Sequence, residues 1–86
     1  MARQPTQPLN VVARAPFHLY YEGAAERVSA VNRVGTFDIL PGHADFFSVL
    51  SPGDVTIETE SDMISFKIAN GIMAVRGDAV MLFINI

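Results

Sequence analysis

Residues 35–44 read GTFDILPGHA, and this stretch gives the clearest indication of how the chain folds. A short apolar run ends at Pro41-Gly42, a dipeptide typical of a turn, and an imidazole follows directly at His43. A brief strand that stops at such a turn is the repeating unit of antiparallel sandwiches and barrels. The stretch therefore favours an all-β fold.

The rest of the chain repeats this pattern. Short runs rich in β-branched and aromatic residues alternate with turn residues, and no segment has a sustained helical period. Strands are expected at residues 9–15, 18–21, 27–30, 37–40, 46–50, 55–59, 63–69, 72–75 and 79–86. The sequence thus predicts one domain at residues 9–86, an all-β fold built as a small antiparallel β-sandwich or flattened barrel of about eight to ten short strands. Residues 1–8, with two prolines, are expected to form a flexible tail.

Two further turns and the last strand lead to specific expectations. Asn70-Gly71 is expected to supply the positive φ angles of a tight hairpin turn or a bulge, and Gly77-Asp78 suits the hairpin turn before the last strand. Residues 79–86 are apolar on both faces of that strand. Either the strand is covered on both sides or one of its faces is an interface, and simple burial is favoured.

The composition suggests surplus apolar surface. Hydrophobic residues make up 50% of the 86 residues and the mean hydropathy is +0.30, which is high for a domain whose polar atoms must cover a large surface. Some apolar surface is therefore expected to meet a neighbour. Phe46 and Phe47 are adjacent on an expected strand, so one ring can enter the core while the other points outward. The outward ring is either a docking site or ordinary scattered exposure.

Several classes of function are disfavoured. The longest apolar run, residues 79–84, is far shorter than the roughly 20 residues of a membrane-spanning helix. The chain has no cysteine, which excludes disulfides and thiolate metal sites and fits a reducing, cytoplasmic setting. A net charge of −3 without a cluster of basic residues argues against a nucleic-acid partner.

Neither catalysis nor metal binding is expected. The two histidines, His18 and His43, have no Asp or Glu at a spacing that would complete a metal site. A trio of Ser48, His43 and Asp45 could be assembled, but the sequence lacks the elbow motif that exposes a nucleophilic serine. No cofactor is expected either, because the chain has no glycine-rich phosphate loop.

The quoted stretch, taken with residues 70–75 (NGIMAV), resembles the signature of the epsilon subunit of rotary F-type ATP synthases, and specifically its N-terminal β-sandwich domain. Residues 9–12 (LNVV), 21–23 (YEG) and 51–53 (SPG) support the resemblance, which covers nearly the whole chain from Leu9 to Ile86. The resemblance implies a non-catalytic subunit of the central stalk, or rotor, that couples the gamma subunit to the c-ring in proton-driven ATP synthesis.

Further implications follow from the same resemblance. The subunit would bind no ATP and no cofactor, and it would lie at the cytoplasmic face of the inner (cell) membrane, touching the membrane only indirectly through the c-ring. The implied gamma interface comprises His43, Phe46, Phe47 and Ser48. The implied c-ring interface is the turn with Arg33, Val34, Thr36, Phe37 and Asp38.

The chain departs from the family pattern in ways that bear on function. Val34 and Thr36 replace residues that are commonly acidic, which removes negative charge from the tip expected to face the c-ring. The match stops at Ile86, whereas most members continue into a C-terminal helical hairpin that carries inhibition and nucleotide sensing, so this chain is expected to lack those inhibitory helices. The alternative reading is a free-standing β-sandwich module that binds a protein of another assembly.

Overall fold

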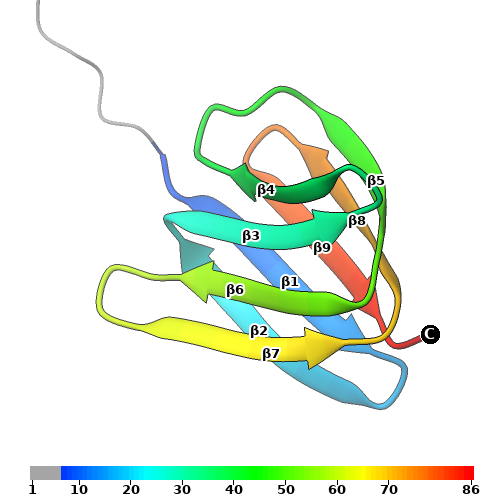
Figure 1. The fold of residues 1–86 in the computed structure, drawn as a ribbon. Coiled ribbons are helices and arrows are strands. Elements are labelled where there is room, and N and C mark those ends of the chain that lie inside the picture. The colour runs from blue at the N-terminus through cyan, green and yellow to red at the C-terminus, as the bar shows by residue number, and fades with distance from the viewer. Residues whose placement is uncertain (1–6) are drawn as a thin grey trace, which may run out of the picture.

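The computed structural model describes residues 7–86, which form two β-sheets packed face to face (Figure 1). The strands are β1 (Leu9–Ala15), β2 (His18–Ala25), β3 (Arg27–Asn32), β4 (Gly35–Ile39), β5 (Phe46–Leu50), β6 (Gly53–Glu58), β7 (Met63–Ile68), β8 (Gly71–Arg76) and β9 (Ala79–Ile84). The larger sheet has the order β2-β1-β9-β8-β5, and the smaller one has the order β4-β3-β6-β7. Neighbouring strands are antiparallel except β1 and β9, which run parallel. The predicted all-β sandwich is confirmed. Of the tail predicted at residues 1–8, residues 1–6 lie outside the described residues.

The alternation of side chains along each strand determines which residues enter the core. In β9, for example, Val80, Leu82 and Ile84 are buried while Met81 and Phe83 point the other way. In the part of the chain that the structure describes, no polar or charged residue is buried. Full burial of a Leu or Ile side chain contributes roughly 1.5–3 kcal/mol, so this interior is the main source of stability.

A β-bulge in β2 turns two consecutive tyrosines toward the interior. Adjacent residues of β1 pair with Leu19 and Tyr21, so Tyr20 is left without a partner on that strand. Both tyrosines consequently pack against the core. The ring of Tyr20 stacks on Phe66 of β7, with centroids 4.5 Å apart, and this contact joins the edges of the two sheets.

Seven of the nine strands begin or end at other residues than the sequence predicted, most of them by one or two residues, and the differences in β2 and β9 have a clear cause. β2 continues to Ala25 instead of ending at Tyr21, because β1 pairs with it along its whole length, from Leu9 opposite Ala25 to Ala15 opposite His18. The last strand ends at Ile84 because Asn85 has a left-handed φ of 53°.

The connection between β7 and β8 is not the hairpin that the sequence predicted. The two strands belong to different sheets, and neither Asn70 nor Gly71 has a positive φ. Gly71 is required instead by close packing, since a Cβ at this position would lie 2.8 Å from the carbonyl oxygen of Phe83 and 2.9 Å from Cγ2 of Ile84. The turn at Gly77, with a φ of 58°, does join the antiparallel strands β8 and β9 as predicted.

Gly71→Ala should lower the free energy of unfolding by about 1–3 kcal/mol, because the backbone of β9 cannot move away from the new methyl group without disturbing its pairing with β8. Urea denaturation measures the change. Gly77→Asn is the matched control, since asparagine tolerates a left-handed φ and a Cβ at this position has no neighbour within 4 Å. Equal stability of Gly71→Ala and the wild type would contradict the packing argument.

Candidate protein interface

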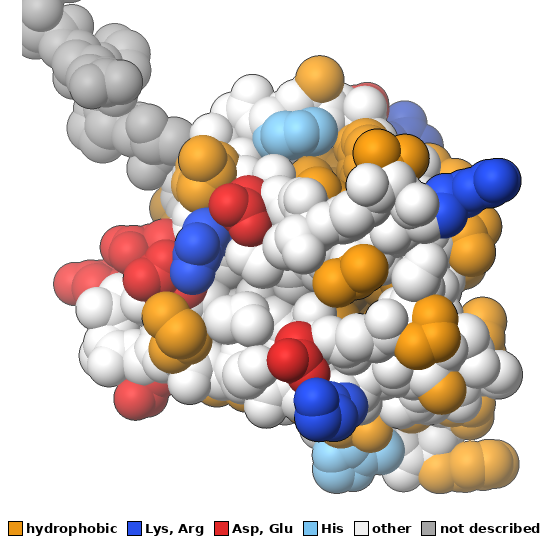
Figure 2. Space-filling model, viewed as in Figure 1, with side chains coloured by type: hydrophobic (Ala, Val, Ile, Leu, Met, Phe, Trp, Pro, Cys, Tyr) orange, Lys and Arg blue, Asp and Glu red, His pale blue; other side chains and the backbone are white. Residues whose placement is uncertain are grey.

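The outer face of the smaller sheet is polar, and its side chains pair with one another across neighbouring strands. Figure 2 shows this face toward the viewer, with charged and other polar side chains spread among scattered hydrophobic ones. The contacts are Ser29 Oγ to Asp38 Oδ1 (2.5 Å), Thr56 Oγ1 to Ser65 Oγ (3.2 Å), Lys67 Nζ to Asp54 Oδ1 (3.2 Å) and Arg27 Nε to Glu58 Oε1 (3.2 Å). This face therefore resembles an ordinary solvated surface.

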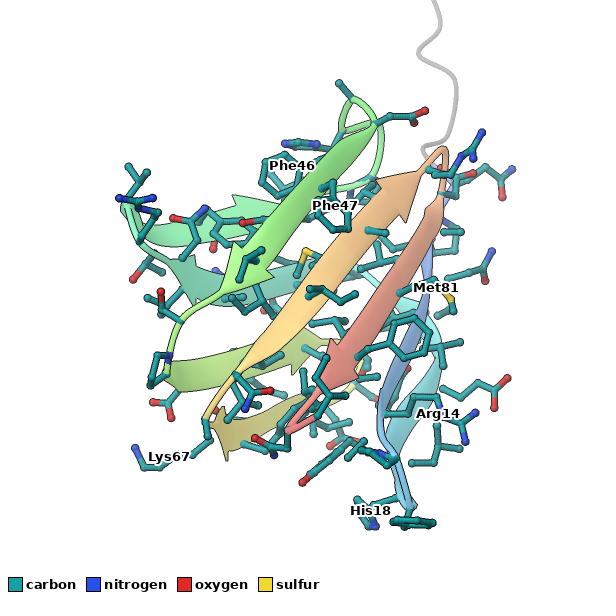
Figure 3. All side chains as sticks on the ribbon, turned by 90° about the vertical axis from the view of Figure 1, so that its right-hand side faces the viewer. Arg14, His18, Phe46, Phe47, Lys67 and Met81 are labelled. Carbon is teal, nitrogen blue, oxygen red and sulfur yellow. The ribbon has the colours of Figure 1, made fainter. Side chains whose placement is uncertain are left out.

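The outer face of the larger sheet is apolar. In the register of the sheet, Phe47, Ala74, Met81 and Val12 lie side by side across four strands, and a second row contains Val49, Ile72 and Phe83. Phe47 and Val49 are 65% and 67% exposed, and Met81 and Phe83 are more than one-third exposed. We call this surface the apolar face, defined by Val12, Leu19, Phe47, Val49, Ile72, Ala74, Ala79, Met81 and Phe83 (Figure 3).

The last strand is not buried on both sides, although the sequence favoured simple burial. One side of β9 is buried and the other, with Met81 and Phe83, is open to solvent. A row of apolar side chains across four neighbouring strands is unusual for a domain on its own and favours an interaction surface.

Arginine side chains lie among the apolar ones on this face. Arg14 and Arg76 occupy outward positions of β1 and β8, and both are exposed. Among residues 7–86, neither of them makes a salt bridge; the ion pairs present lie on the other sheet. The apolar face thus offers a partner two unpaired positive charges.

The four residues of the predicted gamma interface do not share one surface. Phe47 lies on the apolar face, whereas Phe46 points inward and packs on Phe37 of β4, with ring centroids 5.4 Å apart. Ser48 also points inward, and its Oγ accepts a hydrogen bond from Asn32 Nδ2 at 3.2 Å. His43 lies in the loop before β5 with its ring edge-on to Phe46. A partner that touched all four would have to wrap around the edge strand β5.

The predicted c-ring residues are divided between the β3–β4 turn and the strand that follows it. Arg33 and Val34 form the tip, where Val34 is 93% exposed. Oδ1 of Asn32 accepts hydrogen bonds from the backbone N–H groups of Val34 (2.9 Å) and Gly35 (3.2 Å), which holds the tip in shape. The other three residues lie on β4: Thr36 and Asp38 point to the polar outer face, and Phe37 packs against the core.

The structure also places residues in the candidate interface that the sequence did not suggest, namely Val49, Ile72, Met81 and Phe83. The one available signal was the last strand, which is apolar on both faces. The register of β8 with β5 and β9 brings these residues together, and in the sequence β5 is separated from β8 by two strands of the other sheet.

Residues 7–86 contain neither a metal-binding group nor a membrane-spanning helix. The structure contains there no group of three or more His, Cys, Asp or Glu side chains that could hold a metal ion. Across the same residues, there is also no helix with the length and hydropathy needed to cross a membrane.

The fold and the apolar face together define the class of protein: a small β-sandwich domain with a surface suited to protein–protein contact. Residues 8–85 match the family model of the ATP synthase delta/epsilon chain, beta-sandwich domain. The chain belongs to this family.

Relatives and solved structures agree with this assignment. The chain is 36% identical to the ATP synthase epsilon chain of Ruthia magnifica over 63 residues, which are 73% of this chain and 46% of that protein. It is 30% identical to the ATP synthase epsilon chain of Desulforudis audaxviator over 82 residues, covering 95% of this chain and 58% of that one. The chain thus spans about half the length of the curated relatives it matches.

The fold is shared with a chain in the cryo-EM structure of the Euglena gracilis mitochondrial ATP synthase (OSCP/F1/c-ring). The TM-score is 0.83 at 17% identity, with 96% of this chain and 53% of that chain covered. A chain in the central stalk/c-ring structure of the Tetrahymena thermophila mitochondrial ATP synthase has a TM-score of 0.77 at 20% identity, covering 94% and 66%. At these identities the likeness concerns the fold.

Proposed function

We propose that this chain is a non-catalytic subunit of the central stalk of an F-type ATP synthase, that the gamma subunit covers its apolar face, and that its β3–β4 turn meets the c-ring. In this position it couples gamma to the ring during proton-driven ATP synthesis, binds no nucleotide, and lies peripherally at the cytoplasmic face of the membrane. The observation that carries the proposal is the contrast between the two outer faces in a chain of this family. The smaller sheet pairs its own polar groups, whereas the larger sheet exposes apolar side chains.

The proposed gamma contact is centred on the apolar face of the larger sheet, whereas the sequence placed it along β5 and the loop before it. Phe47 is common to the sequence-based interface and the apolar face, so it is the expected anchor. Phe46 and Ser48 lie on the inner side of β5. The ring of Phe46 packs on Phe37, and Ser48 accepts a hydrogen bond from Asn32. His43 remains available to a partner that extends past the edge strand.

Co-purification tests the assembly itself. A tagged copy of the chain, expressed in cells that carry the rest of the synthase, should retain gamma and the c-ring through a detergent-solubilised purification. Retention of a different stable partner, without gamma, would instead support a free-standing β-sandwich module in another assembly.

Contact with the c-ring should be comparatively insensitive to salt. The tip of the β3–β4 turn presents an apolar side chain, Val34, and the carboxylate of Asp38 is already bonded to Ser29. Ionic contacts weaken as screening shortens to about 8–10 Å at physiological ionic strength, whereas apolar burial does not. Binding to a gamma-bound ring, measured at low and moderate salt, should therefore change little, and Val34→Asp should weaken it. If moderate salt and Arg33→Ala both abolished binding, Arg33 would carry the contact and the apolar tip would not.

A further inference from the structure

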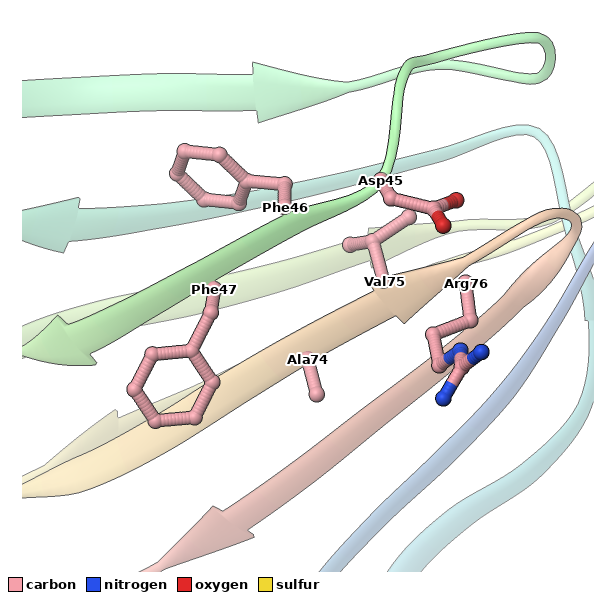
Figure 4. Close-up of a pocket in the computed structure, with 6 residues that line it drawn as sticks. All are labelled: Asp45, Phe46, Phe47, Ala74, Val75 and Arg76. Carbon is pink, nitrogen blue, oxygen red and sulfur yellow. The ribbon is translucent and has the colours of Figure 1, made fainter.

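A hollow on the apolar face has a small residue as its floor and larger side chains around it. In the register of the sheet, Ala74 lies between Phe47 of β5 and Met81 of β9, and its outward neighbours on β8 are Ile72 and Arg76. Figure 4 shows Phe47, Ala74 and Arg76 pointing to the same side of the sheet, with the ring and the guanidinium on either side of the alanine methyl group. The hollow has a volume of about 380 Å³ and opens to solvent.

The positive charge of Arg76 forms no salt bridge with the carboxylate that lines the same hollow. Asp45 also lines the hollow, but its Oδ1 accepts a hydrogen bond from the backbone N–H of Gly77 at 2.9 Å. In the described part of the chain, Arg76 forms no salt bridge, and Figure 4 shows its guanidinium turned away from Asp45. Its planar set of N–H donors therefore remains available to a partner.

We propose that this hollow receives one bulky apolar side chain of the partner and that Arg76 pairs with a carboxylate beside it on the same partner. The proposal rests on the function proposed above for the identity of that partner, the gamma subunit. A side chain seated on Ala74 between Phe47 and Arg76 would be covered by this chain from below and by its own protein from above, and such burial is typical of the residues that dominate interface energies. An arginine–carboxylate pair adds a directional contact.

Together the two contacts fix the position of the partner along the sheet. The other residues of the apolar face would tolerate a partner shifted by one strand or one residue pair, because flat apolar surfaces carry little directional information. Ala79 also lies opposite Arg76, but it is two strands away from Phe47. Among the described residues of the face, only Ala74 has both the aromatic ring and the arginine beside it, so this combination sets the register of binding.

Ala74→Leu tests the hollow by filling it. We expect its affinity for purified gamma subunit, measured by calorimetry, to fall by about tenfold or more, because the partner's side chain can no longer enter. Ala24→Leu is the matched control: Ala24 is another outward alanine of the larger sheet, but it lies on β2 at the far edge, opposite Asn10. The control should bind within about twofold of the wild type, and thermal unfolding of both variants verifies the fold. Wild-type or tighter binding by Ala74→Leu would overturn the role of the hollow.

Arg76→Glu tests the charge at the rim. We expect a loss of about tenfold or more in affinity, against about threefold or less for Arg14→Glu, an equally unpaired arginine at the other side of the same face. Equal effects of the two substitutions would overturn the specific role of Arg76 and leave only a general attraction to positive charge.

These outcomes separate the present proposal from the proposed function. If Phe47→Asp weakens binding but Ala74→Leu and Arg76→Glu do not, the apolar face still binds gamma and the hollow has no role. If the wild-type chain does not bind gamma at all, both proposals are wrong.

Discussion

Phe47→Asp should weaken binding of the chain to the gamma subunit by about 2 kcal/mol or more, which is roughly a thirtyfold loss in affinity. Phe47 is 65% exposed in the free domain, so its ring becomes buried only when a partner covers it. A carboxylate in its place would be desolvated against an apolar partner surface, and it would border the hollow above Ala74. Isothermal titration with purified gamma subunit measures the change directly.

A second substitution tests whether the loss of affinity depends on where the new charge lies. Ser65→Asp places the same charge on β7, on the outer face of the smaller sheet, and should leave the affinity unchanged within error. Both variants should unfold at the wild-type temperature, because neither side chain is buried. Equal affinity of Phe47→Asp and the wild type for gamma would remove the apolar face from the interface.

Leu82→Ala should lower the free energy of unfolding by about 2–5 kcal/mol, the range for deleting a buried leucine side chain. Leu82 is 1% exposed and lies on β9, the middle strand of the larger sheet, so the surrounding backbone cannot easily close the cavity. For a small domain whose total stability is on the order of 5–15 kcal/mol, this is a large fraction of the whole. Urea denaturation followed by circular dichroism measures it.

The neighbouring residue on the same strand is the natural comparison. Met81→Ala should cost less than about 1 kcal/mol in stability, since that side chain is partly exposed already, yet it should weaken binding to gamma. Leu82→Ala would then lower mainly the stability, as expected for a core residue, and Met81→Ala mainly the affinity for gamma, as expected for an interface residue. If Met81→Ala destabilised the domain as much as Leu82→Ala, the outer face of β9 would belong to the core.

Much of the strand pattern could be predicted from the sequence because its signals are local. The strands before Pro41-Gly42 and Gly77 end within one residue of the predicted positions, and Phe46 and Phe47 point to opposite faces as the strand geometry requires. Asn70-Gly71 was misinterpreted because a short connection between two strands reads the same whether the strands pair with each other or enter different sheets. Only the packing of β8 against β9 reveals why glycine is needed there.

The candidate interface was predicted less completely, since it depends on which strands become neighbours. An apolar strand is compatible with burial on both sides or with one exposed side, so the outward positions Met81 and Phe83 could not be assigned from residues 79–86 alone. The parallel pairing of the first and last strands places Val12 next to Met81, although 69 positions separate them in the chain. No local pattern reports such a pairing.

Site-specific cross-linking tests the central claim most directly, because the chain has no cysteine of its own. A single cysteine introduced by Val49→Cys lies on the apolar face, and one introduced by Ser65→Cys lies on the polar face of the other sheet. Each is labelled with a short photoactivatable reagent, and the variant is assembled with gamma and the c-ring before illumination. We predict a covalent product with gamma from position 49 and none from position 65. A product with gamma from position 65 and none from position 49 would contradict the claim that the apolar face binds the central stalk.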